Sequence, residues 1–178
     1  MKSEIAIIGC GRIGSVHARA ITETLPMVDL VLADVEPSRA IDLAKRVGAH
    51  AVDIADIWDR PNLCAVAICS STTTHVDYIC AAAEAGVAVF CEKPVSLDLD
   101  EVDRAVRAVT DSDIPFMVGF HKRFDPTHQA TKQAVVDGRV GDVHLLRITT
   151  RDPQPPPLDY ISVSGGIFLD MTIHDFDM

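Results

Sequence analysis

Short apolar runs alternate with amphipathic segments along the first two thirds of the chain. The apolar runs predict buried strands, and the segments between them have the apolar spacing of helices. The expected strands are residues 5–8, 28–33, 49–52, 64–69, 87–91 and 115–120. The expected helices are residues 13–24, 37–47, a short turn carrying Trp58, 75–86 and 98–110. This alternation predicts right-handed crossovers and therefore an α/β fold with a doubly wound parallel sheet, the Rossmann class.

The pattern changes after residue 120. Residues 121–137 predict a helix, and residues 141–151 predict one long strand. Residues 152–157 are rich in proline and predict a stiff connection at a site, with a ligand for a proline-recognising domain as the alternative. Residues 164–178 predict a helix that is entered through glycines.

One strand cannot form a sheet or cover both of its own faces. We therefore expect residues 121–178 to be the incomplete beginning of a second, substrate-binding α+β domain. Residues 1–120 are the expected dinucleotide-binding domain, with the boundary near residue 120. On this interpretation the sequence resembles the front part of a longer protein.

The first expected strand leads into the first helix through Gly9-Cys10-Gly11-Arg12-Ile13-Gly14. In this G-x-G-x-x-G pattern, the first glycine permits a tight turn and the second lets the backbone approach a pyrophosphate. The third allows close packing of helix and strand, and the helix N-terminus faces the phosphates. The expected cofactor contacts here are Gly9, Gly11, Arg12, Ile13 and Gly14. The alternative is an α/β domain that has a glycine turn and binds no nucleotide.

The second expected strand ends in Asp34, about 20 residues after the glycine motif. A carboxylate at this place accepts hydrogen bonds from the adenosine ribose and repels a 2′-phosphate. Val35 follows it, and the nearest arginine, Arg39, falls in the next helix. The pattern therefore favours NAD over NADP.

Ligands of such sheets bind outside the carboxyl ends of the strands. Polar residues follow two further expected strands, in the segments 70–75 and 92–94. The additional cofactor contacts that we expect are Ser70, Thr72, His75, Glu92 and Lys93.

Composition narrows the partners. The chain is 48% hydrophobic and 24% charged, and its formal net charge is −10. This charge argues against nucleic acid and against an anionic membrane surface as partners. There is no apolar run of membrane-spanning length and no space for a signal peptide before the first strand, so we expect a cytoplasmic protein. The five cysteines form no C-x-x-C pair, and we expect free thiols rather than a metal site.

Oxidation of a secondary alcohol by NAD needs a base that titrates near neutral pH, and histidine fits this role. On a regular helix, Asp170, His174 and Asp177 would share one face. His174 is the candidate base, with Asp170 orienting its ring. Lys93 can stabilise the developing alkoxide. The alternatives are a helix-stabilising Asp–His pair and an ordinary charge at a strand end.

Four motifs carry a resemblance that extends along the chain: GCGRIG at 9–14, CEKP at 91–94, GFHKRFDP at 119–126 and SGGIFLDMTIHDFDM at 164–178. The sequence resembles the Gfo/Idh/MocA family of NAD(P)-dependent oxidoreductases, and within it the bacterial enzymes that oxidise inositol. The resemblance implies that Lys93, Asp170 and His174 are the catalytic set. It further implies that Arg123 and Asp177 contact substrate hydroxyls and that the Lys93–Pro94 bond is cis.

The resemblance also implies a reaction, the oxidation of myo-inositol to 2-keto-myo-inositol with NAD. Another cyclic polyol or sugar stays open as substrate, as does a truncated NAD-binding module without catalysis. Family members have a complete second domain that mediates tetramer contacts. A homo-oligomer is therefore expected for the full-length protein.

Overall fold

The computed structural model describes residues 2–161 and 163–178. The chain forms two compact units, Met1–Gly119 and Phe120–Met178. That the first is the cofactor domain and the second the beginning of a substrate domain stays a prediction. No helix among the described residues combines the length and the apolar character that crossing a membrane requires.

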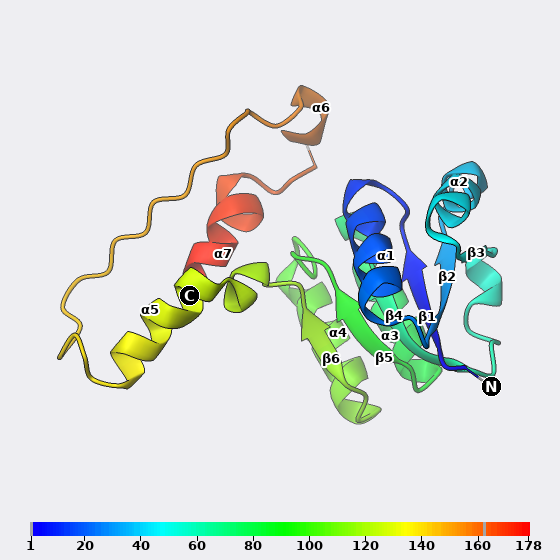
Figure 1. Cartoon of the computed structure of the whole chain (residues 1–178), viewed down its shortest axis with the longest axis horizontal. Coiled ribbons are helices and arrows are strands. Elements are labelled where there is room, and N and C mark those ends of the chain that lie inside the picture. The colour runs from blue at the N-terminus through cyan, green and yellow to red at the C-terminus, as the bar shows by residue number, and fades with distance from the viewer. Residues whose placement is uncertain (1, 162) are drawn as a thin grey trace. The chain divides into compact units, whose positions relative to one another are not determined.

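The first unit contains a six-stranded sheet in which every paired strand is parallel (Figure 1). The strand order is β3-β2-β1-β4-β5-β6, which is the order of a doubly wound dinucleotide-binding sheet. The strands are β1 (Glu4–Ile8), β2 (Asp29–Ala33), β3 (His50–Ala51), β4 (Leu63–Ile68), β5 (Ala88–Cys91) and β6 (Phe116–Val118). The predicted fold class is confirmed.

Four α-helices and two short 3₁₀ turns connect these strands. They are α1 (Arg12–Thr24), α2 (Pro37–Val47), η1 (Ile54–Asp56), η2 (Thr72–Thr74), α3 (His75–Glu84) and α4 (Leu99–Asp111). Local sequence explains their ends. Pro37 occupies the first turn of α2, and Gly48 ends that helix with a positive φ of 72°. Asp98 caps α4 by accepting a hydrogen bond from the amide of Asp100 at 2.8 Å.

Apolar side chains pack against both faces of the sheet. On one face, Ile7 and Leu32 pack with buried residues of α1 and α2. On the other, Ile8, Val31 and Ile68 pack with α3 and α4. All five side chains are at most 1% exposed. Each such burial contributes about 1.5–3 kcal/mol, so the central strands are held between two helical layers.

The second unit begins with a short 3₁₀ helix, η3 (His121–Phe124), followed by α5 (Pro126–Val136). The single helix predicted over residues 121–137 is wrong, because the chain breaks at Asp125. A residue before proline avoids the helical conformation, and Asp125 is extended, with ψ at 126°. Its carboxylate caps α5 by accepting from the amides of Thr127 and His128 at 2.9 and 3.0 Å.

The strand predicted over residues 141–151 is also wrong. The structure assigns no strand or helix to this segment, which Figure 1 shows as a long connection after α5. Leu145 and Leu146 are 82% and 64% exposed. A strand needs a neighbour to pair its amides and carbonyls, and the described residues of this unit supply none.

The last segment enters its helix through Gly165 and Gly166, which have positive φ angles of 76° and 85°. This confirms the predicted glycine entry. The helix is not regular, because it starts as a π turn, η4 (Phe168–Thr172), and continues as α7 (Ile173–Phe176). A four-residue element, α6 (Leu158–Ile161), precedes it. Asp170 lies in the π turn, so the α-helical spacing that would place it on one face with His174 and Asp177 does not hold there.

Candidate dinucleotide site and candidate catalytic residues

Residues that follow strands are hydrogen-bonded through their backbone amides to the neighbouring strand of the sheet. The amide of Gly9, after β1, donates to Ala33 on β2 at 2.9 Å. The amide of Cys69, after β4, donates to Ile8 on β1 at 2.7 Å. The amide of Glu92, after β5, donates in the same way to Ile68 on β4 at 2.9 Å. Predicted cofactor residues from four strands therefore share one edge of the sheet.

The three glycines of the first loop differ in what a side chain at their position would meet. Gly9 has a positive φ of 98°, and a Cβ atom there would lie 2.5 Å from the carbonyl carbon of Cys69. A Cβ atom at Gly14 would lie 1.9 Å from the carbonyl oxygen of Gly9. At Gly11, by contrast, a Cβ atom would meet nothing within 4 Å. Gly9 and Gly14 are required by the protein itself, whereas Gly11 leaves open space beside the loop.

The N-terminus of α1 adjoins this open space. Gly11 is the N-cap and has no side chain to accept from the first amides of the helix, which belong to Arg12, Ile13 and Gly14. No acidic side chain lies in the first turn. Amides that lack partners at the positive end of a helix dipole bind phosphate groups well. The loop therefore fits a pyrophosphate, and these residues would hold it.

Asp34 is fixed beside the glycine loop by two backbone amides. Its Oδ2 accepts from the amide of Cys10 at 2.6 Å, and its Oδ1 accepts from the amide of Glu36 at 2.9 Å. The nearby thiol of Cys10 is buried, and this burial, together with the charge of Asp34, raises its pKa to about 12. The carboxylate is thus held at the end of β2, the place where the ribose of a dinucleotide is recognised.

A hollow of about 400 Å³ shares Cys10 with this site and is also lined by Arg39, Asp42 and Arg46. Arg39 forms an ion pair with Glu36, with Nε 2.6 Å from Oε2. Arg39 is the arginine that a 2′-phosphate could use, and this carboxylate already engages it. Both side chains of this pair are exposed, and Arg46 lines the same hollow, so the preference for NAD over NADP rests on Asp34 and stays a prediction.

Replacing Asp34 with serine is expected to lower the ratio of the NADP Kd to the NAD Kd at least about tenfold. The reason is that a like charge beside the 2′-phosphate, which disfavours NADP by several kcal/mol, is removed. Calorimetric titration of both dinucleotides measures the ratio, and Asp103→Ser, at an exposed position on α4, is the matched control. An unchanged ratio in Asp34→Ser would contradict the assignment.

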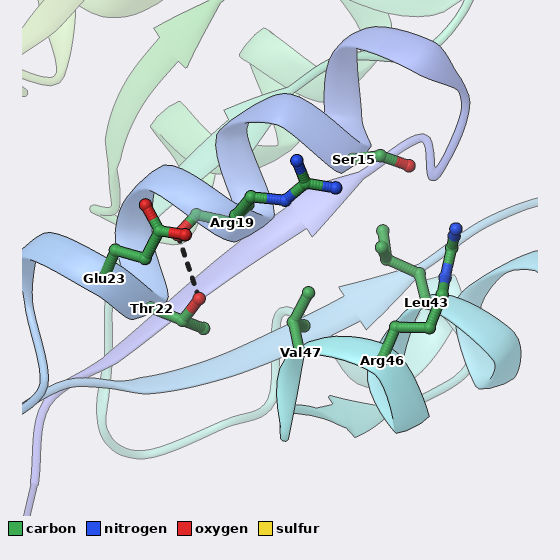
Figure 2. Close-up of a pocket in the computed structure, with 7 residues that line it drawn as sticks. All are labelled: Ser15, Arg19, Thr22, Glu23, Leu43, Arg46 and Val47. Carbon is green, nitrogen blue, oxygen red and sulfur yellow. Dashed lines mark hydrogen bonds between the residues drawn. The ribbon is translucent and has the colours of Figure 1, made fainter.

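A second hollow, of about 290 Å³, lies between α1 and α2 (Figure 2). Its lining residues are Ser15, Arg19, Thr22, Glu23, Leu43, Arg46 and Val47. It lies in the helical layer and contains none of the predicted cofactor residues. It is not the predicted dinucleotide site.

The segment Glu92-Lys93-Pro94 follows β5, and its Lys93–Pro94 bond is cis, as the resemblance implied. Glu92 Oε1 lies 2.6 Å from Nε2 of His17, and Oε2 accepts from the amide of Lys93 at 3.3 Å. Burial raises the pKa of Glu92. The hydrogen bond and charge of His17, together with the backbone amide and charge of Lys93, lower that pKa by more than burial raises it. The pKa of Glu92 is therefore below its ordinary value.

Sequence reasoning missed His17, which α1 brings to the strand-end edge. Its partner Glu92 lies 75 residues away in the chain, so no local pattern connects them. The only available signal is that His17 is one helical turn beyond Gly14, on a helix that begins at the site.

His75 is 1% exposed at the start of α3. Its Nδ1 lies 2.9 Å from the carbonyl oxygen of Pro94, and its Nε2 lies 3.1 Å from that of Ser70. Burial lowers the pKa of His75 more than the two carbonyls and Glu92 raise it. Both ring nitrogens thus face backbone oxygens. The predicted cofactor contacts of Ser70, Thr72 and His75 stay predictions.

In the second unit, His174 is 7% exposed on α7. Its ring contacts those of His121 and Phe120, with centroids 4.2 and 6.3 Å apart. The Oδ1 of Asp170 accepts a hydrogen bond from the hydroxyl of Tyr160 at 2.8 Å. That Asp170 orients the His174 ring stays a prediction.

Arg123 and Asp177, the predicted substrate contacts, lie together. The Nε of Arg123 donates to Asp177 at 2.8 and 3.0 Å, and this pairing keeps the pKa of Asp177 below its ordinary value. Lys122 pairs in the same way with Asp175, which also accepts from Thr150 at 2.8 Å. Sequence reasoning did not predict the pair of Lys122 with Asp175. The available signal was that two adjacent basic residues, 122 and 123, and two acidic residues, 175 and 177, offer two possible ion pairs.

The predicted catalytic set is divided between the units. Lys93 lies in the first, and Asp170 and His174 lie in the second. Their convergence on one substrate hydroxyl stays a prediction.

Comparison with known proteins gives two family matches. Residues 3–120 match the oxidoreductase family with an NAD-binding Rossmann fold, named GFO_IDH_MocA. Residues 128–178 match the GFO/IDH/MocA C-terminal domain. The predicted cofactor, NAD, is confirmed at the level of this family.

Similar curated proteins are bacterial dehydrogenases. The chain is 47% identical to myo-inositol 2-dehydrogenase of Thermotoga maritima, covering 98% of this chain and 53% of that protein. It is 45% identical to inositol 2-dehydrogenase of Rhizobium meliloti, covering 100% of this chain and 54% of that protein. The chain therefore spans about half the length of the curated relatives that it matches.

Solved structures agree. A myo-inositol dehydrogenase of Corynebacterium glutamicum superposes with a TM-score of 0.90 at 42% identity, over 99% of this chain and 54% of that one. A scyllo-inositol dehydrogenase of Lactobacillus casei, solved with NAD(H) and scyllo-inositol, superposes with a TM-score of 0.89 at 31% identity. That match covers 99% of this chain and 55% of the other.

Proposed function

We propose, for a chain that belongs to the Gfo/Idh/MocA oxidoreductase family, that its complete protein oxidises a secondary hydroxyl of a cyclic polyol to a ketone. The favoured substrate is myo-inositol, and the product is then 2-keto-myo-inositol. The observation that carries the proposal is the 45–47% identity, along practically the whole chain, to proteins named as inositol 2-dehydrogenases. The edge of the sheet that carries the predicted cofactor residues also supports the proposal, because NAD is the oxidant that this reaction needs.

The roles of the residues follow from the chemistry of the hydroxyl. His174 takes the hydroxyl proton as general base, and Asp170 stabilises the charged imidazole. The ammonium group of Lys93 donates to the hydroxyl oxygen and stabilises the negative charge that develops there. Arg123 and Asp177 contact other hydroxyls of the ring. When bound, NAD supplies the acceptor for the hydride that leaves the carbinol carbon.

The donor set suits a polyol rather than a carboxylic acid. Arg123 is neutralised by Asp177, and Lys122 by Asp175. Paired carboxylates and cations offer both acceptors and donors to neutral hydroxyl groups. We further propose that the complete protein is a cytoplasmic homo-oligomer, a tetramer by the family resemblance.

Two other functions are kept as candidates. The similarity to a scyllo-inositol dehydrogenase supports the epimer, scyllo-inositol, as an alternative substrate. An NAD-binding module without turnover is the second, because the family match of residues 3–120 is to an NAD-binding domain alone.

The test is an assay of the protein expressed from its complete reading frame, with NAD and a panel of myo-inositol, scyllo-inositol, other cyclic polyols and sugars. We expect NADH formation, fastest with myo-inositol. Fastest turnover of scyllo-inositol would select the epimer. NAD binding without NADH formation on any member of the panel would favour the non-catalytic module and refute the enzyme.

A further inference from the structure

Two histidines from two different helices reach the segment that carries Lys93. His17, on α1, contacts the carboxylate of Glu92 at 2.6 Å. His75, which begins α3, contacts the carbonyl oxygen of Pro94 at 2.9 Å. Lys93 is the residue between these two contacts. The tripeptide is thus held at both ends by groups outside its own loop.

Both partners of the contact between His17 and Glu92 are held in place by further contacts. The ring of His17 packs edge-on against Phe90 on β5, with centroids 5.0 Å apart and an interplanar angle of 65°. The side chain of Glu92 is 15% exposed, and its second oxygen accepts from the backbone amide of Lys93. The carboxylate of Glu92 therefore links α1 to the backbone of Lys93 itself.

The His75 contact is decided by the position of one hydrogen. Burial lowers the pKa of this ring below its ordinary value, which favours the neutral form at neutral pH, and a neutral imidazole carries a hydrogen on only one nitrogen. Both nitrogens face carbonyl oxygens, so only one of the two contacts can be a donated hydrogen bond. The contact to Pro94, at 2.9 Å, is shorter than the contact to Ser70, at 3.1 Å.

We propose that His17 and His75 are positioning residues that together hold Lys93 at the substrate hydroxyl. His17 acts through Glu92, and His75 acts with its hydrogen on Nδ1 through the Pro94 carbonyl. The inference rests on the proposed function, because it takes the role of Lys93 from there. A misplacement of about 1 Å of a reacting group lowers turnover by as much as about a hundredfold.

Paired amide substitutions test each contact separately. The amide nitrogen of asparagine is as many bonds from Cα as Nδ1 of histidine, and that of glutamine as many as Nε2. His75→Asn can therefore keep the donor to Pro94, and His75→Gln cannot. At His17 the order reverses, because Nε2 makes the contact, so His17→Gln keeps the donor and His17→Asn loses it.

The expected result is a crossed pattern in kcat, measured with saturating myo-inositol and NAD on the protein from its complete reading frame. His75→Asn and His17→Gln should stay within about threefold of the parent, and His75→Gln and His17→Asn should fall about 10- to 100-fold. His50→Asn and His50→Gln, at an exposed position on β3, are the matched controls. Neither control should change kcat.

Two further measurements separate positioning from loss of structure. Tm should differ little between the asparagine and glutamine variants at one position, whereas kcat should differ strongly. Deuterium uptake by residues 92–96, measured without substrate, should rise in His75→Gln and His17→Asn above their paired variants. This exchange measurement does not depend on turnover. If the variants at one of the two histidines do not fold, the variants at the other still test whether that histidine holds the Lys93 segment.

Equal kcat losses for both amides at each position, in proportion to Tm, would overturn the inference. The reverse order at His75 would place its hydrogen on Nε2 and would also overturn it. A parent protein that oxidises no polyol would refute the proposed function instead, and the exchange pattern would still decide whether the two histidines hold the segment.

Discussion

Replacing His174 with alanine is expected to lower kcat for polyol oxidation by about 10²–10⁴-fold, the usual contribution of a positioned general base. The Kd for NAD should change by no more than about twofold, because all of the expected dinucleotide contacts belong to the first unit and none of them is made by His174. Stopped-flow NADH formation and calorimetric titration of NAD measure the two quantities. The protein from its complete reading frame is needed for both.

His144→Ala is the matched control, since His144 belongs to the same unit and is exposed. It should leave kcat unchanged. His174 is buried against Phe120 and His121, so Tm of the variant must be measured as well. A kcat loss below about tenfold in a folded variant would assign the base to another group. Equal losses in kcat and in NAD affinity would assign His174 a structural role.

The first unit was predictable because its information is local. The run Cys64–Cys69 is apolar throughout, as expected for a central parallel strand, and β4 is indeed covered by helices on both faces. Pro37 and Gly48 mark the two ends of α2 in the sequence as they do in the structure. Given the observed strand order, the right hand of the crossovers then explains why α1 and α2 cover one face and α3 and α4 the other.

The second unit was less predictable, for two different reasons. The helix break at Asp125 is visible in the sequence as a residue before a proline, and this local restriction overrides the periodic pattern across it. The strand over residues 141–151 failed because apolar alternation describes a preference, whereas a strand exists only with a partner. A π turn, as at η4, has no reliable sequence signature, so the place of Asp170 could not be deduced from helical spacing.

The candidate site shows the same division. Gly9, Gly14 and Asp34 could be predicted as cofactor contacts because they belong to a motif with fixed spacing. The contacts of His17 with Glu92, and of His75 with Pro94, join residues 75 and 19 positions apart. Only the packing of α1 and α3 against the sheet creates them. Sequence spacing therefore predicted the groups that we expect to meet the cofactor, and it missed His17, one of the two histidines that contact the Lys93 segment.

Alanine at Gly11 and alanine at Gly14 are both expected to weaken NAD binding, but only alanine at Gly14 is expected to lower Tm. In Gly14→Ala, the new Cβ would lie 1.9 Å from the Gly9 carbonyl oxygen, so the loop must shift. Overpacking of this kind destabilises by about 1–3 kcal/mol, which corresponds to a fall in Tm of roughly 2–12 °C for a chain of this size. NAD binding should weaken as well, because the loop that moves is the one that faces the pyrophosphate.

In Gly11→Ala, the new Cβ meets nothing within 4 Å, and the φ angle of −72° suits alanine. Tm should therefore stay within about 2 °C of the parent, since the entropic gain of about 0.4–1 kcal/mol offsets the poorer N-cap. The NAD Kd should nevertheless rise at least about tenfold, because the methyl group takes the space through which the pyrophosphate approaches the backbone. Differential scanning calorimetry and NAD titration of the 178-residue chain measure both effects. A Gly11→Ala protein that binds NAD as tightly as the parent would show that the open space beside the loop is not the phosphate site, whatever Gly14→Ala does to stability.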